Sequence, residues 1–277
     1  MSDMNSTANM AVFCDFENVA LGVRDANYKR FDIQQVLERL LLKGNIVVKK
    51  AYCDWDRYKG FKSTMHEAAF ELIEIPHVRM SGKNSADIRM VVDALDLCYT
   101  KAHVDVFVVI SGDSDFSPLV AKLRENNKLV IGVGVKNSTS DLLIASCDEF
   151  IYYDDLIRAA DKRKPRAKKS GSKKKTRSSK AAAKETEAET EVDRTQEAFD
   201  LLLETLDDMM AERGDKKVWG SMVKQAIKRR KPGFNESYHG FKGFSQLLEE
   251  AQKKGLITMQ NDAESGGHII TAVNADD

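Results

Sequence analysis

The segment Val106–Ile110 consists of five consecutive apolar residues, Val-Phe-Val-Val-Ile, and it ends at Ser111-Gly112. A short run without polar residues that is closed by glycine is typical of a strand buried on both faces of a parallel sheet. Asp113 and Asp115 follow at the carboxyl end of this strand. In open α/β sheets, ligands bind beyond the carboxyl ends of the strands. The segment therefore predicts a parallel sheet with a candidate site at one edge.

The N-terminal half of the chain alternates short apolar segments with segments of helical periodicity. The expected strands cover residues 10–14, 46–53, 72–78, 106–110, 129–135 and 149–153, and the expected helices cover residues 31–42, 58–70, 85–99, 117–126 and 140–146. Strands that alternate with helices in this way form βαβ units. We therefore expect residues 1–160 to form an α/β domain, with a mostly parallel sheet covered by helices on both faces.

Charge is distributed unevenly along the chain. The 277 residues include 43 basic and 43 acidic side chains, so the formal net charge is zero. Residues 158–184 contain thirteen Lys or Arg and one acid, Asp161, which gives this stretch +12 and leaves −12 for the rest. Residues 163–191 have no aromatic or large aliphatic side chain, so they bury too little surface to offset the entropy of ordering. We expect residues 161–194 to be a disordered basic linker.

Helical periodicity returns after the linker. Helices are expected over residues 199–213, 218–229 and 241–253, followed by a hairpin of residues 255–259 and 268–272. Three helices followed by a two-stranded ribbon are the outline of a winged helix-turn-helix, which we expect for residues 195–277. Basic residues on and after the second helix suit phosphate contact, although a solvated helix end is the structural alternative. They are Lys224, Lys228, Arg229, Arg230 and Lys231.

Cysteine usage and hydropathy limit the class of protein. Cys14, Cys53, Cys98 and Cys147 are widely separated and form no CxxC motif, so they are expected to be small buried residues in a reducing compartment. The N-terminus lacks a signal-peptide pattern, and there is no run of about 18 apolar residues. We expect a cytoplasmic protein without membrane contact. The basic run KKKTRSSK would favour a nuclear location in a eukaryote.

Acidic residues recur at related ends of the predicted elements. Asp15 follows the first strand, Asp113 follows the strand that ends at Ile110, and Asp87 lies in the first turn of a helix. The two strands are expected to be sheet neighbours, so the three carboxylates would converge. Hard divalent cations prefer oxygen ligands, and Mg²⁺ takes one or two carboxylates together with waters and phosphate oxygens. The pattern predicts a Mg²⁺ or Mn²⁺ site that cuts a phosphodiester.

Each of these residues also has a structural interpretation. Aspartate after a strand is a common turn residue and helix N-cap. Asp115 would then cap the following helix, and Asp87 would complement a helix dipole. The hypothesis of a metal site depends on the convergence of several acids, with Asn18 three residues after Asp15 and Asp141 as a further candidate.

Four segments resemble the NYN domain, the PIN-like nuclease family that includes LabA-like proteins: FCDFENVA, KNSADIRMVVDALDLCY, VVISGDSDFSPLV and LVIGVGVKNSTSDLLIASCDEF. The resemblance covers roughly residues 10–153. It implies a PIN-like fold and a Mg²⁺- or Mn²⁺-dependent ribonuclease, in which water attacks the phosphodiester and leaves a 5′-phosphate. It implies Asp15, Asp87 and Asp113 as metal ligands, catalytic supporting roles for Asn18 and Asp115, and a lesser role for Asp141 near the substrate.

Residues 195–272 resemble the OST-HTH, or LOTUS, domain, above all in the stretch YHGFKGFSQLL, from which His239 departs as an insertion. Such domains are associated with binding of RNA or protein. The partners expected are therefore RNA, with DNA as an alternative, and a second copy or another protein through the C-terminal domain. The basic linker would add salt-sensitive affinity that does not depend on nucleic-acid sequence.

The favoured hypothesis is a metal-dependent ribonuclease whose C-terminal domain and linker recruit RNA. The alternative is a non-catalytic RNA-binding or regulatory adaptor that retains the nuclease fold. The acids favour the enzyme, because clustered carboxylates repel one another unless a cation compensates them. A phosphatase of the haloacid dehalogenase type is a third alternative.

Overall fold

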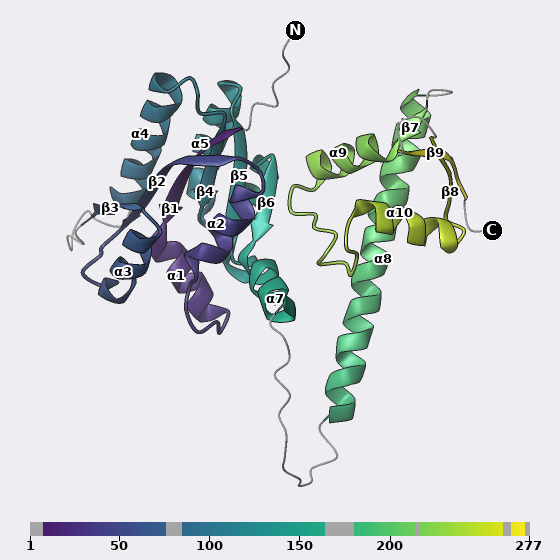
Figure 1. The fold of residues 1–277 in the computed structure, drawn as a ribbon, viewed down its shortest axis with the longest axis horizontal. Coiled ribbons are helices and arrows are strands. Elements are labelled where there is room, and N and C mark those ends of the chain that lie inside the picture. Colours follow the sequence, from purple (N-terminus) through teal and green to yellow (C-terminus); the bar gives the residue numbers. More distant parts are fainter. Residues whose placement is uncertain (1–7, 76–84, 164–179, 214–216, 263–266, 275–277) are drawn as a thin grey trace. The chain divides into compact units, whose positions relative to one another are not determined.

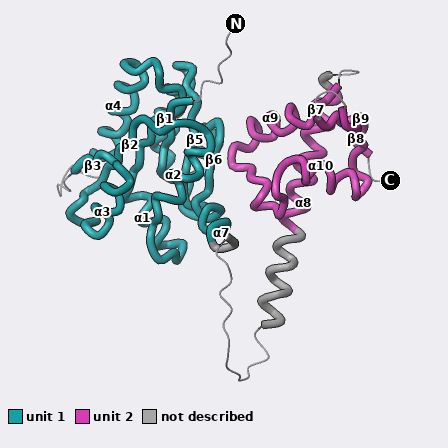
Figure 2. The backbone as a smooth tube through the Cα atoms, viewed as in Figure 1, with its two compact units in different colours: residues 1–164 teal, residues 165–277 magenta. Residues whose placement is uncertain are grey.

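The computed structural model describes residues 8–75, 85–163, 180–213, 217–262 and 267–274 (Figure 1). The chain forms two compact units, residues 1–164 and residues 165–277 (Figure 2). Within the described residues, no helix combines the length and the apolar character that crossing a bilayer requires.

Unit 1 is built on a six-stranded sheet with the order β3-β2-β1-β4-β5-β6. All neighbouring strands pair in parallel, which confirms the prediction from the alternating pattern. The chain runs outward from β1 to β3 and then returns to β4, which lies on the other side of β1. Crevices at such reversals of strand order are where open α/β sheets bind ligands. The strands are β1 (Asn9–Asp15), β2 (Asn45–Cys53), β3 (Glu71–Glu74), β4 (Val106–Ile110), β5 (Leu129–Gly134) and β6 (Glu149–Tyr152).

Helices cover both faces of this sheet, as predicted. One core contains apolar side chains of α1 (Phe16–Asp25), α2 (Ile33–Leu41), α3 (Lys59–Glu67) and α7 (Tyr153–Arg163). The other contains those of α4 (Ser85–Thr100), α5 (Ser117–Glu125) and α6 (Asp141–Ser146). Short 3-10 turns, η1 (Ser114–Phe116) and η2 (Lys136–Ser138), follow β4 and β5.

Strand β4 shows why its sequence contains no polar residue. All five residues are buried, and they alternate between the two cores. Val108 and Ile110 pack on the α1 side, whereas Phe107 and Val109 pack on the α4 side. The four cysteines are also buried and free, as their separation predicted.

Two helices of unit 1 were not expected from the sequence. Helix α1 begins at Phe16, directly after β1, because the Asp15 carboxylate caps it by accepting from the Asn18 N–H. Only Phe16, Val19 and Val23 are its large buried side chains, too few to make a clear periodic signal. Helix α7 likewise begins directly after β6. Strand β3 ends at Glu74, and the rest of the strand expected over residues 72–78 lies mostly outside the described residues.

Unit 2 consists of three long helices and a small antiparallel sheet with the order β7-β9-β8. Phe199, Leu202 and Leu206 of the first helix pack with Val223 and Leu248 of the other two. The elements are α8 (Lys180–Arg213), β7 (Val218–Trp219), α9 (Gly220–Arg230), α10 (Phe244–Lys253), β8 (Ile257–Asn261) and β9 (His268–Val273).

Two expectations for this half are corrected. Helix α8 begins at Lys180, so the disorder expected up to residue 194 is wrong for residues 180–194. Their Ala, Glu and Lys residues have high helix propensity, which explains a helix where composition offers little apolar surface. Residues 164–179, with much of the basic run, lie outside the described residues. A helix was also expected from Val218, but Val218 and Trp219 pair with β9 instead.

Candidate active site

A cavity of about 480 Å³ lies at the carboxyl ends of β1 and β2. Its lining comes from the end of β1 and the first turns of α1, from the segments that follow β2, β3 and β4, and from the first turn of α4. The lining residues are Asp15, Glu17, Asn18, Leu21, Asp54, Arg57, Ile75, Ala86, Asp87 and Asp113. The cavity thus gathers Asp15, Asn18, Asp87 and Asp113 from the sequence-predicted set. It lies where the strand order reverses between β1 and β4.

Asp15 is the last residue of β1, and only 6% of its surface is exposed. One carboxylate oxygen accepts a hydrogen bond from the Ser111 hydroxyl at 2.9 Å, and the other accepts from the Asn18 N–H at 3.4 Å. Burial is the largest cause that raises the pKa of Asp15, and the negative charge of Asp87 raises it too; against the two hydrogen bonds, which lower it, the pKa reaches about 7. Asp15 is therefore a buried acid that ionises near neutral pH.

A hydrogen bond joins the segments that follow β1 and β4. The side-chain oxygen of Asn18 accepts from the Gly112 N–H at 2.9 Å, and β1 and β4 are adjacent in the sheet. Glycine is required at position 112, because an added Cβ would lie 2.5 Å from the backbone oxygen of Ser138. Asn18 thus holds the two strand ends in register, which supports the prediction that strands before Asp15 and Asp113 are neighbours.

Asp87 and Asp113 bring the other predicted carboxylates to the cavity. Asp87 lies in the first turn of α4 and is half-buried. Burial, followed by the charges of Asp113, Asp115 and Glu17, raises the pKa of Asp87 to about 6. Asp113 is the N-cap of η1 and accepts from the Asp115 N–H at 3.0 Å. Burial is the largest cause of both pKa shifts, and the negative charges of neighbouring carboxylates add to it.

The structure separates Asp115 and Asp141 from the lining of the cavity. Asp115 is exposed and acts on the site through its charge on Asp87. The capping role suggested for Asp115 belongs to Asp113, because the carboxylate at the end of the strand reaches the first free N–H. Asp141 is exposed at the start of α6 and lies outside the residues that line the cavity.

Sequence reasoning missed four residues of the site. Ser111 orients Asp15, and Glu17, Asp54 and Arg57 line the cavity. Glu17 follows Asp15 by two residues and faces the same space. Asp54 and Arg57 follow the end of β2, and their position after a strand next to β1 was the available signal.

The cavity offers hard oxygen ligands for a divalent cation. Within the described ranges, however, no group of three or more Asp, Glu, His or Cys side chains is arranged to hold an ion. The oxygens of Asp15 and Asp113 are held by hydrogen bonds from Ser111, Asn18 and Asp115. The donor set still fits Mg²⁺ or Mn²⁺, because such ions take one or two carboxylates together with waters and phosphate oxygens. The raised pKa values of Asp15 and Asp87 mark a site that a cation would stabilise.

The basic residues predicted to contact RNA lie on and just after α9 in unit 2. Lys224 pairs with Glu236 at 2.9 Å, and Arg230 pairs with both Glu204 and Asp208. Arg229 and Lys231 are exposed. Lys228 is half-buried at the last turn of the helix. Lys224 and Arg230 of the predicted cluster thus have acidic partners, although Arg230 is exposed like Arg229 and Lys231.

These features define an α/β protein with an acidic cavity at the reversal point of a parallel sheet. The model of the NYN domain family matches residues 9–155, and the chain belongs to this family. The family is generally a PIN-like nuclease fold, whose members usually use divalent metals and act on nucleic acid.

A protein of unknown function from Vibrio parahaemolyticus RIMD 2210633, which is known from a crystal structure, is 29% identical in sequence to this chain. That match covers 56% of this chain and 98% of the other, with a TM-score of 0.49. No match was found among curated proteins.

Proposed function

We propose that the protein is a Mg²⁺- or Mn²⁺-dependent ribonuclease that hydrolyses phosphodiester bonds of RNA at the unit 1 cavity. The observation that carries this proposal is the convergence of Asp15, Asp87 and Asp113, from three separate segments, on one cavity in which the pKa of Asp15 and of Asp87 is raised. Membership of a nuclease family supports the reaction class.

In this proposal Asp15, Asp87 and Asp113 are the carboxylates available to the cation, which would be held by one or two of them together with waters and phosphate oxygens. The bound cation would supply Lewis-acid chemistry that activates water and offsets the negative charge of the phosphate. Ser111 and the Asn18 N–H fix the orientation of the Asp15 carboxylate through their hydrogen bonds. Asn18 keeps the ends of β1 and β4 together, and Asp115 adds negative charge from outside the cavity. Attack of water on phosphorus with loss of the 3′-oxygen leaves a 5′-phosphate.

We assign unit 2 and the basic segment to RNA recruitment, with unit 2 as an OST-HTH, or LOTUS-like, winged helix. Three helices with a small three-stranded sheet support that assignment. Arg229 and Lys231 are the favoured phosphate contacts of the predicted set, because they are exposed at the end of α9. The basic segment adds salt-sensitive affinity. Deleting residues 162–184 should flatten the salt dependence of RNA binding without abolishing turnover, and an unchanged log–log slope would refute its role.

The alternative is an RNA-binding or regulatory adaptor that keeps the fold without cutting. The observation that favours it is that no three acidic, His or Cys side chains among the described residues form a group ready to hold an ion. Under this alternative the carboxylates of Asp15, Asp87 and Asp113 would take no part in catalysis.

One experiment separates the two functions. Labelled single-stranded RNA is incubated with the full chain and Mn²⁺, with and without EDTA, beside Asp113→Asn. Asp141→Asn is the matched control, because it removes an exposed carboxylate outside the cavity lining. The ribonuclease predicts metal-dependent cleavage that Asp113→Asn abolishes and Asp141→Asn retains. Equal cleavage by Asp113→Asn, or cleavage that survives chelation, would refute the assignment, and RNA binding without cleavage would favour the adaptor.

A further inference from the structure

The charged residues that line the cavity are almost all of one sign. Five are acidic, Asp15, Glu17, Asp54, Asp87 and Asp113, and Arg57 is the one basic residue among the described lining residues. A nucleic-acid strand carries a negative charge at every phosphate, so these carboxylates repel it. A cation bound to one or two of the five would compensate only part of that repulsion. Among the described residues, Arg57 is the positive charge in the lining of the cavity.

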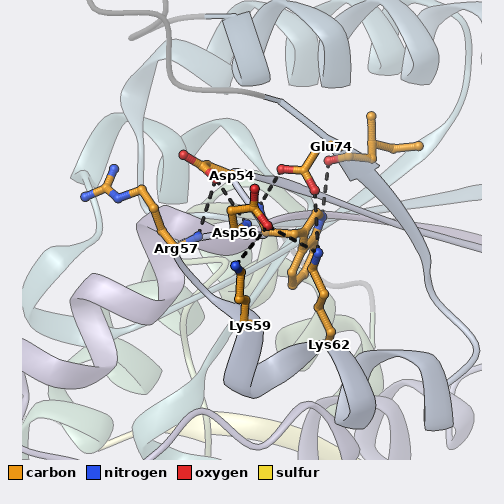
Figure 3. A network of polar contacts seen from close by, with 8 residues as sticks. Asp54, Asp56, Arg57, Lys59, Lys62 and Glu74 are labelled. Atoms are coloured by element: carbon orange, nitrogen blue, oxygen red, sulfur yellow. Dashed lines mark hydrogen bonds and ion pairs between the residues drawn. The ribbon is translucent and has the colours of Figure 1, made fainter.

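The turn that carries Arg57 is tied down by backbone hydrogen bonds. The Arg57 N–H donates to the Asp54 carbonyl at 3.1 Å, and the Asp54 carboxylate accepts from the Asp56 N–H at 3.1 Å. Trp55 between them is buried, and its N–H donates to the Glu74 carboxylate at 2.9 Å. In Figure 3, Arg57 extends away from Lys59 and Lys62. The guanidinium therefore projects from a fixed turn and does not belong to the neighbouring lysine network.

The contacts of the guanidinium leave it able to bind an anion. Its Nη1 donates to the Glu17 carboxylate at 3.0 Å, and 51% of the Arg57 side chain is exposed. An arginine offers several N–H donors in a planar fork that matches the oxygens of a phosphate. Only one of these nitrogens has a partner among the described residues. Glu17 thus orients the guanidinium from one side while its other donors remain accessible.

We propose that Arg57 binds a phosphate group of the nucleic-acid substrate at the cavity, with Glu17 orienting the guanidinium. This inference rests on the proposed function and adds to it a specific contact between protein and substrate. Arg57 and the carboxylates then act on different charges: the carboxylates hold the cation, and Arg57 holds a phosphate oxygen of the strand. A lysine at this position would keep the charge but lose the fork geometry.

The test compares full-length wild type with Arg57→Gln, Arg57→Lys and Lys59→Gln. Lys59 is the matched control, because it is an exposed cation two residues away, pairs with Asp56 and lies outside the cavity lining. Two measurements are made on each protein. The first is the kcat and KM for cleavage of labelled single-stranded RNA with Mn²⁺. The second is the Kd for adenosine 3′,5′-bisphosphate with Mg²⁺, by calorimetry. This probe carries phosphates but no phosphodiester bond to cut.

We expect Arg57→Gln to raise KM and the Kd of the bisphosphate by roughly 10- to 100-fold, the range for losing a hydrogen bond to a charged group. Arg57→Lys should fall in between, and Lys59→Gln should match wild type. If Arg57→Gln cleaves RNA with the KM of wild type and binds the bisphosphate with the Kd of wild type, the inference about Arg57 is overturned and the ribonuclease proposal stands. If wild type binds the bisphosphate but cuts no RNA, and Arg57→Gln loses that binding, the ribonuclease is overturned and the phosphate contact of Arg57 stands. Absence of both cleavage and bisphosphate binding in wild type would overturn both.

Discussion

The carboxylates at the cavity of unit 1 and those beside α9 in unit 2 differ in how they are paired with cations. In unit 1, Asp15, Asp87 and Asp113 face one cavity, and none of them has an ion-pair partner within the described part of the chain. In unit 2, Glu236 pairs with Lys224 at 2.9 Å, and Arg230 bridges two acids of α8. Both units pair some partly buried carboxylates with their own cations, such as Asp93 with Lys50 in unit 1, but the three carboxylates at the unit 1 cavity lack such a partner among the described residues.

The pKa values of the two units reflect this difference. Burial raises the pKa of Asp15, and the next largest cause, the charge of Asp87, raises it too. Burial also acts to raise the pKa of Glu236, but the hydrogen bond and charge of Lys224 outweigh it, so the pKa is lowered. A carboxylate destabilised by its surroundings contributes little to folding, and such groups cluster at functional sites. A carboxylate stabilised by a lysine fits a structural role.

The largest effect should come from removing the charge of Asp15. Its pKa of about 7 in the folded protein exceeds the ordinary value of 3.8. Ionisation therefore opposes folding: the stability contributed by Asp15 is fully present below pH 4 and is lost as pH rises through about 7. Asp15→Asn should unfold like wild type at pH 4 and be more stable at pH 8 by up to about 4 kcal/mol, at 1.36 kcal/mol per pKa unit.

The measurement is urea unfolding in EDTA, followed by the fluorescence of Trp55, in a Trp219→Phe background so that unit 1 alone is observed. Asp141→Asn, which removes an exposed carboxylate, should show no such pH-dependent gain. Replacing EDTA with Mg²⁺ should stabilise wild type more than Asp15→Asn, because a cation relieves the repulsion. Equal stability of wild type and Asp15→Asn across this pH range would show that Asp15 is not destabilised by its surroundings.

Most of the fold followed from the sequence, because burial on both faces leaves a distinct pattern. The limits of β4, Val106–Ile110, were predicted as observed, since every residue is buried and Ser111-Gly112 ends the strand. Helix α1 was missed because Asp15 is both the end of a strand and the cap of a helix, with no loop to mark the boundary. Helix α8 was predicted too short because helix propensity outweighed a composition typical of disorder.

The candidate site was predicted in part. Asp15 and Asp113 were predictable because the ends of adjacent parallel strands meet at one edge of a sheet, and Asp87 because it lies in the first turn of a helix with clear periodicity. Arg57 was not, because its place depends on a turn fixed by Asp54 and Glu74, which come from different strands. Asp141 was expected near the substrate, yet it stands outside the lining, because the start of α6 is exposed. The positions of Arg57 and Asp141 depend on loop geometry, which the pattern of apolar residues does not encode.

A smaller effect should separate the two kinds of basic residue on α9. Arg229→Gln with Lys231→Gln should weaken RNA binding and lower the slope of log affinity against log salt by about 1.4, at about 0.7 per lost contact with a single strand. Arg230→Gln should change this slope much less, because Glu204 and Asp208 already occupy its guanidinium. Fluorescence anisotropy of labelled RNA across a salt series measures both. A larger loss for Arg230→Gln would place the RNA contact on the paired residue instead.

The smallest effect is expected for Glu236, whose removal should lower stability, whereas removing the charge of Asp15 should raise it. The lowered pKa of Glu236 means that its stabilisation is present above its ordinary value of 4.5 and is lost as pH falls through the folded value. Because Lys224 is partly exposed, Glu236→Gln should lower the stability of unit 2 at pH 7 by only about 1 kcal/mol, the upper range for solvent-screened ion pairs. The difference should disappear at low pH, where Glu236 is protonated.

Unfolding monitored by Trp219 fluorescence in a Trp55→Phe background follows unit 2. Lys253 and Glu250 provide the matched control: they form an exposed pair at 2.8 Å on α10, so Glu250→Gln should change stability less than Glu236→Gln. A gain of stability in Glu236→Gln as pH rises would make Glu236 behave like Asp15. The contrast between Glu236, which is paired with Lys224, and the carboxylates of the unit 1 cavity would then fail. Burial alone would account for the pKa of both Glu236 and Asp15.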